Sequence, residues 1–134
     1  MEQSLILVKP DAMERNLGGE IIARFQKAGF KLVALKMLHM DRGMAEKHYA
    51  IHKEKAFFKE LVDYIISGPI IAMVLEKADA VNAARAFMGS TDPKKSPKGS
   101  IRADFGLDIQ RNATHGSDSP ENAEKEIALF FSKK

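Results

Sequence analysis

The hydrophobic positions of the chain predict strands that alternate with helices. Short apolar runs bounded by glycine or proline, which are typical of buried central strands, lie at 4–9, 30–40 and 70–76. Between these runs, apolar residues recur at helical spacing, in one set at Ile21, Phe25 and Ala28 and in another at Phe58, Leu61, Val62 and Ile65. This order predicts a layered α+β or α/β sandwich in which helices pack on a small sheet.

The predicted helices have recognisable ends. Gly29 and Gly68 follow the first two helices, where a glycine commonly ends the last turn. Asp79 is the expected N-cap of a third helix that runs to residue 88. Ser119 is expected to cap a fourth helix, which has Pro120 in its first turn and continues to residue 130.

The stretch from 89 to about 112 fits neither period and is long for a loop. Loops of this length in compact domains usually have a function or are disordered. Basic residues gather here, at Lys94, Lys95, Lys98 and Arg102, with Arg111 after a short gap. Such a loop suits phosphate, although a solvated surface loop is the alternative. The net charge of +3 is too small to indicate a partner by itself.

Composition narrows the classes of protein. With 134 residues, of which 45% are apolar and 29% charged, the chain fits one globular domain over residues 1–134. It has no cysteine, which excludes disulfides, thiolate metal sites and cysteine nucleophiles. The longest uninterrupted apolar run, 70–75, is too short for a membrane span, and Glu2 stands where an export signal would be basic. We therefore expect a cytoplasmic protein without a membrane partner.

Two predicted helices carry a charge on an otherwise apolar face. Arg85 lies in register with Val81 and Met88, and Glu126 lies in register with Ala123 and Phe130. A charge that faces a core needs a partner or lines a cleft, because an unpaired buried charge is costly. The alternative is that each charge lies at the edge of its stripe and reaches water.

The histidines differ in what surrounds them. His48 and His52 form an i, i+4 pair that could hold a metal on a helix over 45–52, but no HExxH pattern accompanies them and we do not favour a metal site. His115 lies in the small polar segment 112–118, directly before the helix with Glu126. That carboxylate could bond one ring nitrogen and leave a lone pair on the other, whereas an ordinary loop histidine is the alternative.

Any phosphate would have to be held by side chains. The chain contains neither GxxxxGK[ST] nor GxGxxG, which excludes the common backbone cradles for nucleotides. The available donors are Lys9, Tyr49, Arg85, Thr91, Arg102 and Asn112. They combine cations with neutral donors, a mixture suited to several phosphate oxygens.

The segment 112–118, NATHGSD, resembles the active-site signature of nucleoside diphosphate kinases. Other segments of that family stand in order along the chain: LVKPD at 7–11, GGEII at 18–22, HY at 48–49, FF at 57–58, SGP at 67–69, MGSTDP at 88–93, GSIRADF at 99–105 and AEKEI at 123–127. Because eight ordered segments span nearly the whole chain, the resemblance is specific.

The resemblance implies both a fold and an activity. The fold would be a ferredoxin-like βαββαβ sandwich of the α+β class, with an antiparallel sheet covered by helices. The chain would transfer the γ-phosphate of a nucleoside triphosphate, mainly ATP, to a nucleoside diphosphate by a ping-pong mechanism. His115 would be the nucleophile that forms a pros-phosphohistidine, with Glu126 orienting it and Ser117 supporting that carboxylate.

The resemblance also implies the binding residues and the assembly. Phosphates or ribose would be bound by Lys9, Tyr49, Arg85, Thr91, Arg102 and Asn112, and Phe57 would stack on the base. Because the motifs hold few carboxylates, Mg²⁺ should arrive bound to nucleotide phosphates and water rather than to the protein. A homo-oligomer is implied, either a tetramer or a hexamer, with Pro93 at a position associated with subunit contacts.

Two alternatives stay open at this stage. A ferredoxin-like sheet with positive charge also describes RNA-recognition domains, but those expose aromatic residues on central strands, where this chain has Leu, Ile, Val and Met. We therefore expect no specific nucleic-acid binding. A catalytically silent family member is the second alternative, and the intact set of motif residues counts against it.

Overall fold

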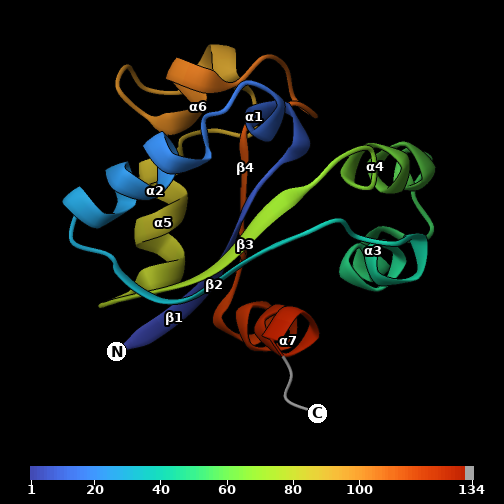
Figure 1. Ribbon diagram of the computed structural model, residues 1–134, viewed down its shortest axis with the longest axis horizontal. Coiled ribbons are helices and arrows are strands. Elements are labelled where there is room, and N and C mark those ends of the chain that lie inside the picture. Colours follow the sequence, from blue (N-terminus) through green and yellow to red (C-terminus); the bar gives the residue numbers. More distant parts are fainter. Residues whose placement is uncertain (132–134) are drawn as a thin grey trace.

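The computed structural model describes residues 1–131, which form a four-stranded antiparallel sheet (Figure 1). The strands are β1 (Glu2–Val8), β2 (Lys31–Leu38), β3 (Ile70–Lys77) and β4 (Thr114–Gly116), in the order β2-β3-β1-β4. The helices are α1 (Pro10–Glu14), α2 (Gly18–Lys27), α3 (Arg42–His48), η1 (Ala50–His52), α4 (Phe58–Ile65), α5 (Ala80–Met88), η2 (Pro93–Lys95), α6 (Ile101–Phe105) and α7 (Pro120–Phe131). The strand order and the helical crossovers confirm the expected α+β, ferredoxin-like arrangement.

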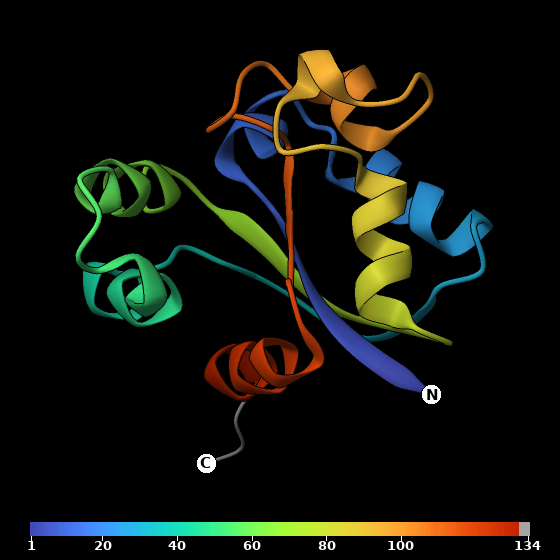
Figure 2. The ribbon, with the colours of Figure 1, turned by 180° about the vertical axis from the view of Figure 1, so that it is seen from behind.

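Helices cover both faces of the sheet, so that β1 lies between two cores. Ile6 and Val8 point into the core formed with α2 and α5, whereas Leu5 and Leu7 point into the core formed with α3, α4 and α7. All four side chains are fully buried, and the burial of each contributes roughly 1.5–3 kcal/mol to the stability of the fold. Figures 1 and 2 show α2, α5 and α6 on one side of the sheet and α3, α4 and α7 on the other.

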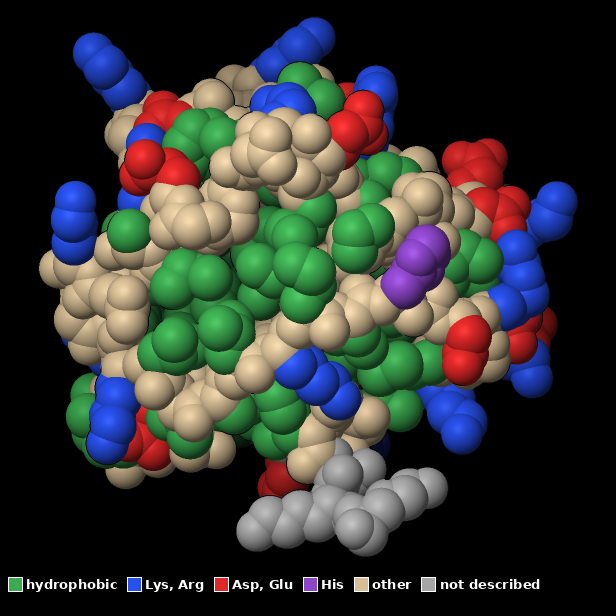
Figure 3. Space-filling view, in the orientation of Figure 1, with side chains coloured by type: hydrophobic (Ala, Val, Ile, Leu, Met, Phe, Trp, Pro, Cys, Tyr) green, Lys and Arg blue, Asp and Glu red, His purple; other side chains and the backbone are tan. Residues whose placement is uncertain are grey.

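The expectation that the run at 30–40 forms a central strand is wrong. Among the described residues, β2 pairs only with β3 and lies at the edge of the sheet. Val33, Leu35 and Met37 are 45%, 48% and 65% exposed. Figure 3 shows hydrophobic side chains gathered across the middle of the face on which β2 lies. The hydrophobic pattern of a segment does not distinguish a buried central strand from an edge strand whose apolar side chains are exposed.

Of the two predicted N-cap residues, one caps its helix through its side chain and the other does not. Ser119 caps α7 as predicted, because its Oγ accepts a hydrogen bond from the backbone N–H of Asn122 at 3.1 Å. Asp79 is the N-cap residue of α5, but its φ of 54° is left-handed and its side chain accepts no capping hydrogen bond. The backbone N–H of Val81 instead donates to Oε1 of Glu2 at 2.8 Å. The start of β1, and not the local sequence, therefore caps α5.

The stretch 89–112 is built from two short helices, η2 and α6, and the turns around them. Each begins at a side-chain cap: Asp92 accepts from the N–H of Lys94 at 3.0 Å, and Ser100 accepts from the N–H of Ala103 at 3.3 Å. The segment is thus an ordered connection, which leads from the end of α5 to β4 and its histidine.

Candidate active site

The short edge strand β4 holds His115. Residue His115 is paired with Leu7 and Gly116 with Ile6, so the backbone of β1 fixes the position of the histidine. The imidazole is 23% exposed. An incoming group can therefore reach a ring that the sheet positions.

Glu126 on α7 bonds to His115, as the spacing predicted. Nε2 of His115 lies 3.2 Å from Oε1 of Glu126, and the hydroxyl of Ser117 donates to the same oxygen at 2.7 Å. Burial raises the pKa of Glu126, but the hydrogen bonds from His115 and Ser117 and the nearby imidazoles outweigh it, so the pKa lies below its usual range. An ionised carboxylate accepts a hydrogen bond from an Nε2 that carries the proton. The lone pair of the neutral ring is then on Nδ1.

Ser117 is itself fixed by β1. Its backbone N–H donates to the carbonyl of Leu5 at 3.1 Å, and its Oγ accepts from the N–H of Leu5 at 3.2 Å. Because Ser117 is fully buried, these bonds leave its hydroxyl little freedom. The serine thus links the backbone of β1 to the carboxylate of Glu126 and fixes the position of that carboxylate.

His48 lies against His115, a contact that the sequence pattern did not predict. The two ring centroids are 4.7 Å apart and the ring planes make an angle of 75°. Burial, and then the charge of His115, lowers the pKa of His48 to about 3, so this imidazole is neutral at physiological pH. Only the HY dipeptide among the family motifs associated His48 with the site.

The continuous helix over 45–52 that an i, i+4 metal pair would require is not formed. The α-helix α3 ends at His48, and the chain then tightens into the 3₁₀ helix η1, which ends at His52. His48 and His52 therefore do not share a continuous helix face. His52 instead has its ring 5.6 Å from that of Phe57, centroid to centroid.

Lys9 lies buried at the end of β1 and bonds to the loop before β4. Its Nζ donates to the carbonyl of Gln110 at 2.7 Å and to Oδ1 of Asn112 at 3.0 Å. Burial lowers the pKa of Lys9 to about 8, with Asp11 opposing that change and Arg102 adding to it. Asn112 completes the link, because its Nδ2 donates to the carbonyl of Thr91 at 3.0 Å.

Arg102 on α6 joins the loop to β4. It donates to the carbonyl of Gly89 at 3.1 Å and to that of Thr114 at 2.7 Å. Burial, and then the charge of Arg85, lowers the pKa of Arg102 to about 10. Two neighbouring cations of this kind would be stabilised by an anion between them.

The other predicted binding residues lie around this centre. Arg85 is exposed on α5, so it does not face the core and the alternative, a side chain that reaches water, is confirmed. Tyr49 is buried against His48, and burial raises its pKa. Thr91 is exposed in the loop, and Phe57 is 45% exposed at the start of α4.

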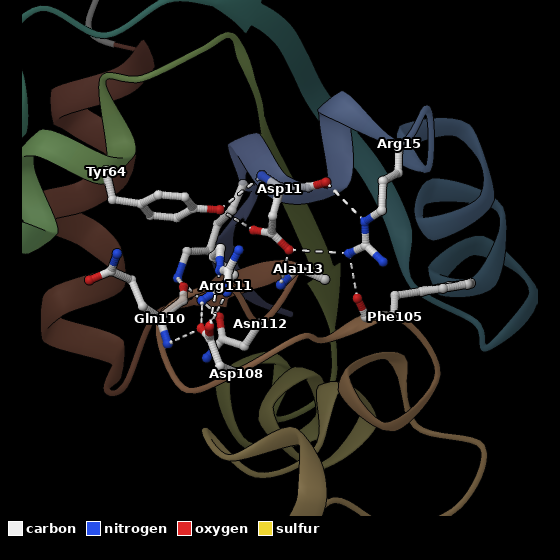
Figure 4. Close-up of polar contacts among 10 residues, drawn as sticks. Asp11, Arg15, Tyr64, Phe105, Asp108, Gln110, Arg111, Asn112 and Ala113 are labelled. Carbon is white, nitrogen blue, oxygen red and sulfur yellow. Dashed lines mark hydrogen bonds and ion pairs between the residues drawn. The ribbon is translucent and has the colours of Figure 1, made fainter.

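A second polar network, centred on Asp11, was also missed. The buried carboxylate accepts from the backbone N–H of Ala113 at 3.1 Å, from Arg15 at 3.3 Å and from the hydroxyl of Tyr64 (Figure 4). Ala113 has a φ of 74°, a left-handed conformation that costs a non-glycine residue roughly 1–3 kcal/mol. Asp11 therefore holds a strained turn two residues before His115.

The structure also shows a surface hollow of about 580 Å³ beside the loop. It is lined by Asp92, Lys94, Leu107, Asp108, Ile109, Gln110 and Arg111. Gln110 connects this hollow to the buried ammonium of Lys9 through its carbonyl. In residues 1–131, none of the helices has the length and apolar character needed to span a membrane.

Comparison with known proteins gives consistent matches over nearly the whole chain. The family model described as "Nucleoside diphosphate kinase" matches residues 2–134. The chain is 58% identical over 132 residues to a nucleoside diphosphate kinase of Pelotomaculum thermopropionicum, covering 98% of this chain and 89% of the relative. A relative of the same name from Dehalococcoides mccartyi is 56% identical over 133 residues, covering 99% and 94%. The structure superimposes on that of Aquifex aeolicus nucleoside diphosphate kinase with a TM-score of 0.95 at 47% identity, covering 98% and 95%.

Proposed function

The chain belongs to the nucleoside diphosphate kinase family, and from this premise we propose that its phosphoryl transfer from a nucleoside triphosphate, mainly ATP, to a nucleoside diphosphate runs through Nδ1 of His115. The observation that carries the proposal is the bond of 3.2 Å between Nε2 of His115 and Glu126. It leaves Nδ1 as the nitrogen with a lone pair, on a ring that is partly exposed.

Each half-reaction then follows the same chemistry. The Nδ1 lone pair forms a bond to the γ-phosphorus while the bond between that phosphorus and the bridging oxygen breaks, and the diphosphate leaves with the electron pair. The ring gains positive charge, which the ionised Glu126 offsets. In the second half-reaction a terminal phosphate oxygen of the nucleoside diphosphate forms a bond to this phosphorus while the Nδ1–P bond breaks and its electron pair returns to Nδ1. One site therefore serves donor and acceptor in turn.

The cations around the site supply the charge that phosphoryl transfer requires. Lys9, Arg85 and Arg102 are the candidates for binding the β and γ phosphates, because Lys9 and Arg102 bond to the segment that leads into β4 and the charge of Arg85 acts on Arg102. The coupling between Arg85 and Arg102 supports this role, since a phosphate would relieve their repulsion.

The residues fit a divalent cation that the nucleotide carries. Glu126 is bonded to His115 and Ser117, and Asp11 to Ala113 and Tyr64, so the two carboxylates do not form the octahedral oxygen cage that Mg²⁺ prefers. When bound with the nucleotide, Mg²⁺ would neutralise part of the phosphate charge. The protein side chains hold the remaining phosphate oxygens.

We assign the remaining binding roles on the family resemblance and on exposure. Phe57 presents its ring to solvent, as base stacking requires, and stacking tolerates every base. Tyr49, Thr91 and Asn112 are the neutral donors for ribose or phosphate. A specific nucleic-acid site is the less favoured alternative, because helices cover both faces of the sheet and bury the central strands.

A homo-oligomer is the assembly we propose. The exposed apolar side chains of β2 support it, because an uncovered strand edge can pair with a second copy of the chain. A tetramer and a hexamer are both compatible with this edge, and sedimentation or light scattering would distinguish them. The cytoplasmic location and the single domain over residues 1–134 stay predictions.

A phosphoenzyme experiment tests the central proposal. Incubation with γ-labelled ATP and Mg²⁺ should give an acid-labile, base-stable label, and His115→Ala should abolish it. His39→Ala is the matched control, because His39 is exposed and its ring bonds only to the carbonyl of Ile66 among the described residues. Label that persists in His115→Ala would reject His115 as the nucleophile.

A further inference from the structure

Three side chains at the active site form a potential set of ligands for a transition metal ion. His48, His115 and Glu126 each offer one ligand atom, and these atoms all lie within 4.8 Å of one another. Nε2 of His115 is 3.2 Å from Oε1 of Glu126, and Nδ1 of His48 is 4.0 Å from the other oxygen of that carboxylate. Two imidazoles and a carboxylate are a set that Zn²⁺ uses when it keeps a fourth position open.

The state of His48 independently indicates a ligand. Its side chain is fully buried, and neither ring nitrogen has a hydrogen-bond partner among the described residues. Buried polar groups are nearly always paired, so an imidazole with both nitrogens free is exceptional. The ring is also neutral, which is the form that binds metal.

A modest adjustment would bring the three ligand atoms to bonding distance. Tetrahedral zinc with bonds of about 2.0–2.2 Å places its ligand atoms about 3.4 Å apart. The contact between His115 and Glu126 already has about this length, and the wider separations must shorten by up to about 1.4 Å. Small rotations of the three side chains can supply that movement.

A cavity lies beside the cluster, although His115 does not line it. A hollow of about 210 Å³ is lined by both His48 and Glu126. Lys47 and Lys125 also line it, and their charges oppose a cation. We therefore expect only ions with a strong preference for imidazole, such as Zn²⁺, to bind there, whereas Mg²⁺ prefers oxygen ligands and nucleotide phosphates.

We propose that His48, His115 and Glu126 bind Zn²⁺ and that the bound ion inhibits phosphorylation of the histidine. Zinc takes the lone pair of Nε2, so the proton that this nitrogen donated to Glu126 moves to Nδ1. The ring stays neutral, but Nδ1 loses the lone pair that attacks phosphorus. The inhibition step rests on the proposed role of His115, whereas the binding step does not.

Binding is tested by titration of ZnCl₂ into the nucleotide-free protein. We expect micromolar affinity by calorimetry, a loss of at least tenfold in His48→Asn, and no change in His39→Asn, which removes an exposed histidine. Equal affinities in the wild type and His48→Asn would overturn the site. Because His48→Asn could disturb folding, nitrogen NMR of the labelled imidazoles in the wild type is the second measurement. Zinc should shift His48 and His115, and shifts confined to His39 or His52 would also overturn the site.

Inhibition is measured separately as the rate of phosphoenzyme formation at fixed MgATP. Zinc at ten times its dissociation constant should lower the wild-type rate about tenfold, and a zinc-selective chelator should restore it. His48→Asn should resist the same zinc concentration relative to its own zinc-free rate. Zinc that binds without slowing phosphorylation would overturn the tautomer step alone. Labelling of His115→Ala would instead reject the nucleophile while leaving the binding result intact.

Discussion

The ring of His48 lies nearly perpendicular to the ring of His115, with the centroids 4.7 Å apart. One imidazole is buried and neutral, and the other is partly exposed and bonded to Glu126. The edge-on contact limits rotation of His115 and so favours the bond between its Nε2 and Glu126. Packing and hydrogen bonding therefore act together on the same ring.

Replacing Glu126 by Gln should slow phosphorylation of His115 without removing the side chain. The amide keeps the shape but not the charge, and hydrogen bonds to charged groups contribute about 1.5–3 kcal/mol, or roughly 10- to 150-fold in rate. Single-turnover labelling with ATP measures this rate. Glu121→Gln, an exposed position in the first turn of the same helix, is the control and should behave as the wild type. An unchanged rate in Glu126→Gln would contradict the positioning role.

Arg85→Ala and Arg102→Ala should each weaken turnover by about 2 kcal/mol or more, because we propose that both bind the phosphates on which charge develops during transfer. They should differ in stability. Arg102 holds the carbonyls of Gly89 and Thr114, so its removal should lower the melting temperature, whereas exposed Arg85 should have little effect. Comparison of kcat/KM with thermal unfolding tests both statements, and near-normal turnover would contradict the proposed binding of phosphate by these arginines.

Asp11→Asn should destabilise the turn before His115. The amide cannot accept from Ala113, Arg15 and Tyr64 as the carboxylate does, and we expect a loss of about 1.5–3 kcal/mol in the free energy of unfolding. Urea denaturation measures the loss, with Glu14→Gln, an exposed residue of the same helix, as the control. If Asp11→Asn were as stable as the wild type, Ala113 would hold its left-handed conformation without the carboxylate.

The buried His48 should make the protein sensitive to acid. Its pKa is about 3 in the folded state against an ordinary value of 6.5, so the unfolded chain binds more protons between these values. Stability is therefore greatest above pH 6.5 and falls as pH drops toward 3, by up to about 1.4 kcal/mol per pH unit from this group. His48→Asn, which cannot be protonated, should show a shallower fall between pH 6.5 and 4 in denaturant titrations. Parallel curves for the two proteins would assign the acid sensitivity to other groups.

Local patterns in the sequence predicted much of this structure, because helix caps and turns depend on interactions between residues that are close in the sequence. Ser119 with Pro120 marks the start of α7, and the positive φ of Gly29 ends α2 as expected. The pairing of His115 with Glu126 was also accessible, since both residues lie close together in sequence and the helix between them has a fixed rise.

The missed features depend on contacts between distant parts of the chain. Glu2 caps a helix that begins 78 residues later, at Ala80, and no local pattern shows that β1 starts beside it. His48 meets His115 because α3 covers the face of the sheet to which Leu7, the β1 partner of His115, points. The edge position of β2 follows from strand order, which hydrophobicity does not encode.

The pairing of β4 with β1 has a consequence for turnover. Lys9 directly follows β1 and His115 lies on the neighbouring strand β4, and the N–H of Lys9 donates to the carbonyl of Ala113 at 2.9 Å. The backbone spacing between Lys9, which we propose binds phosphate, and His115, the proposed nucleophile, is therefore set by strand pairing and not by a hinge. Because the sheet holds both backbones in place, we expect the site to keep the same geometry in the two half-reactions of the proposed transfer.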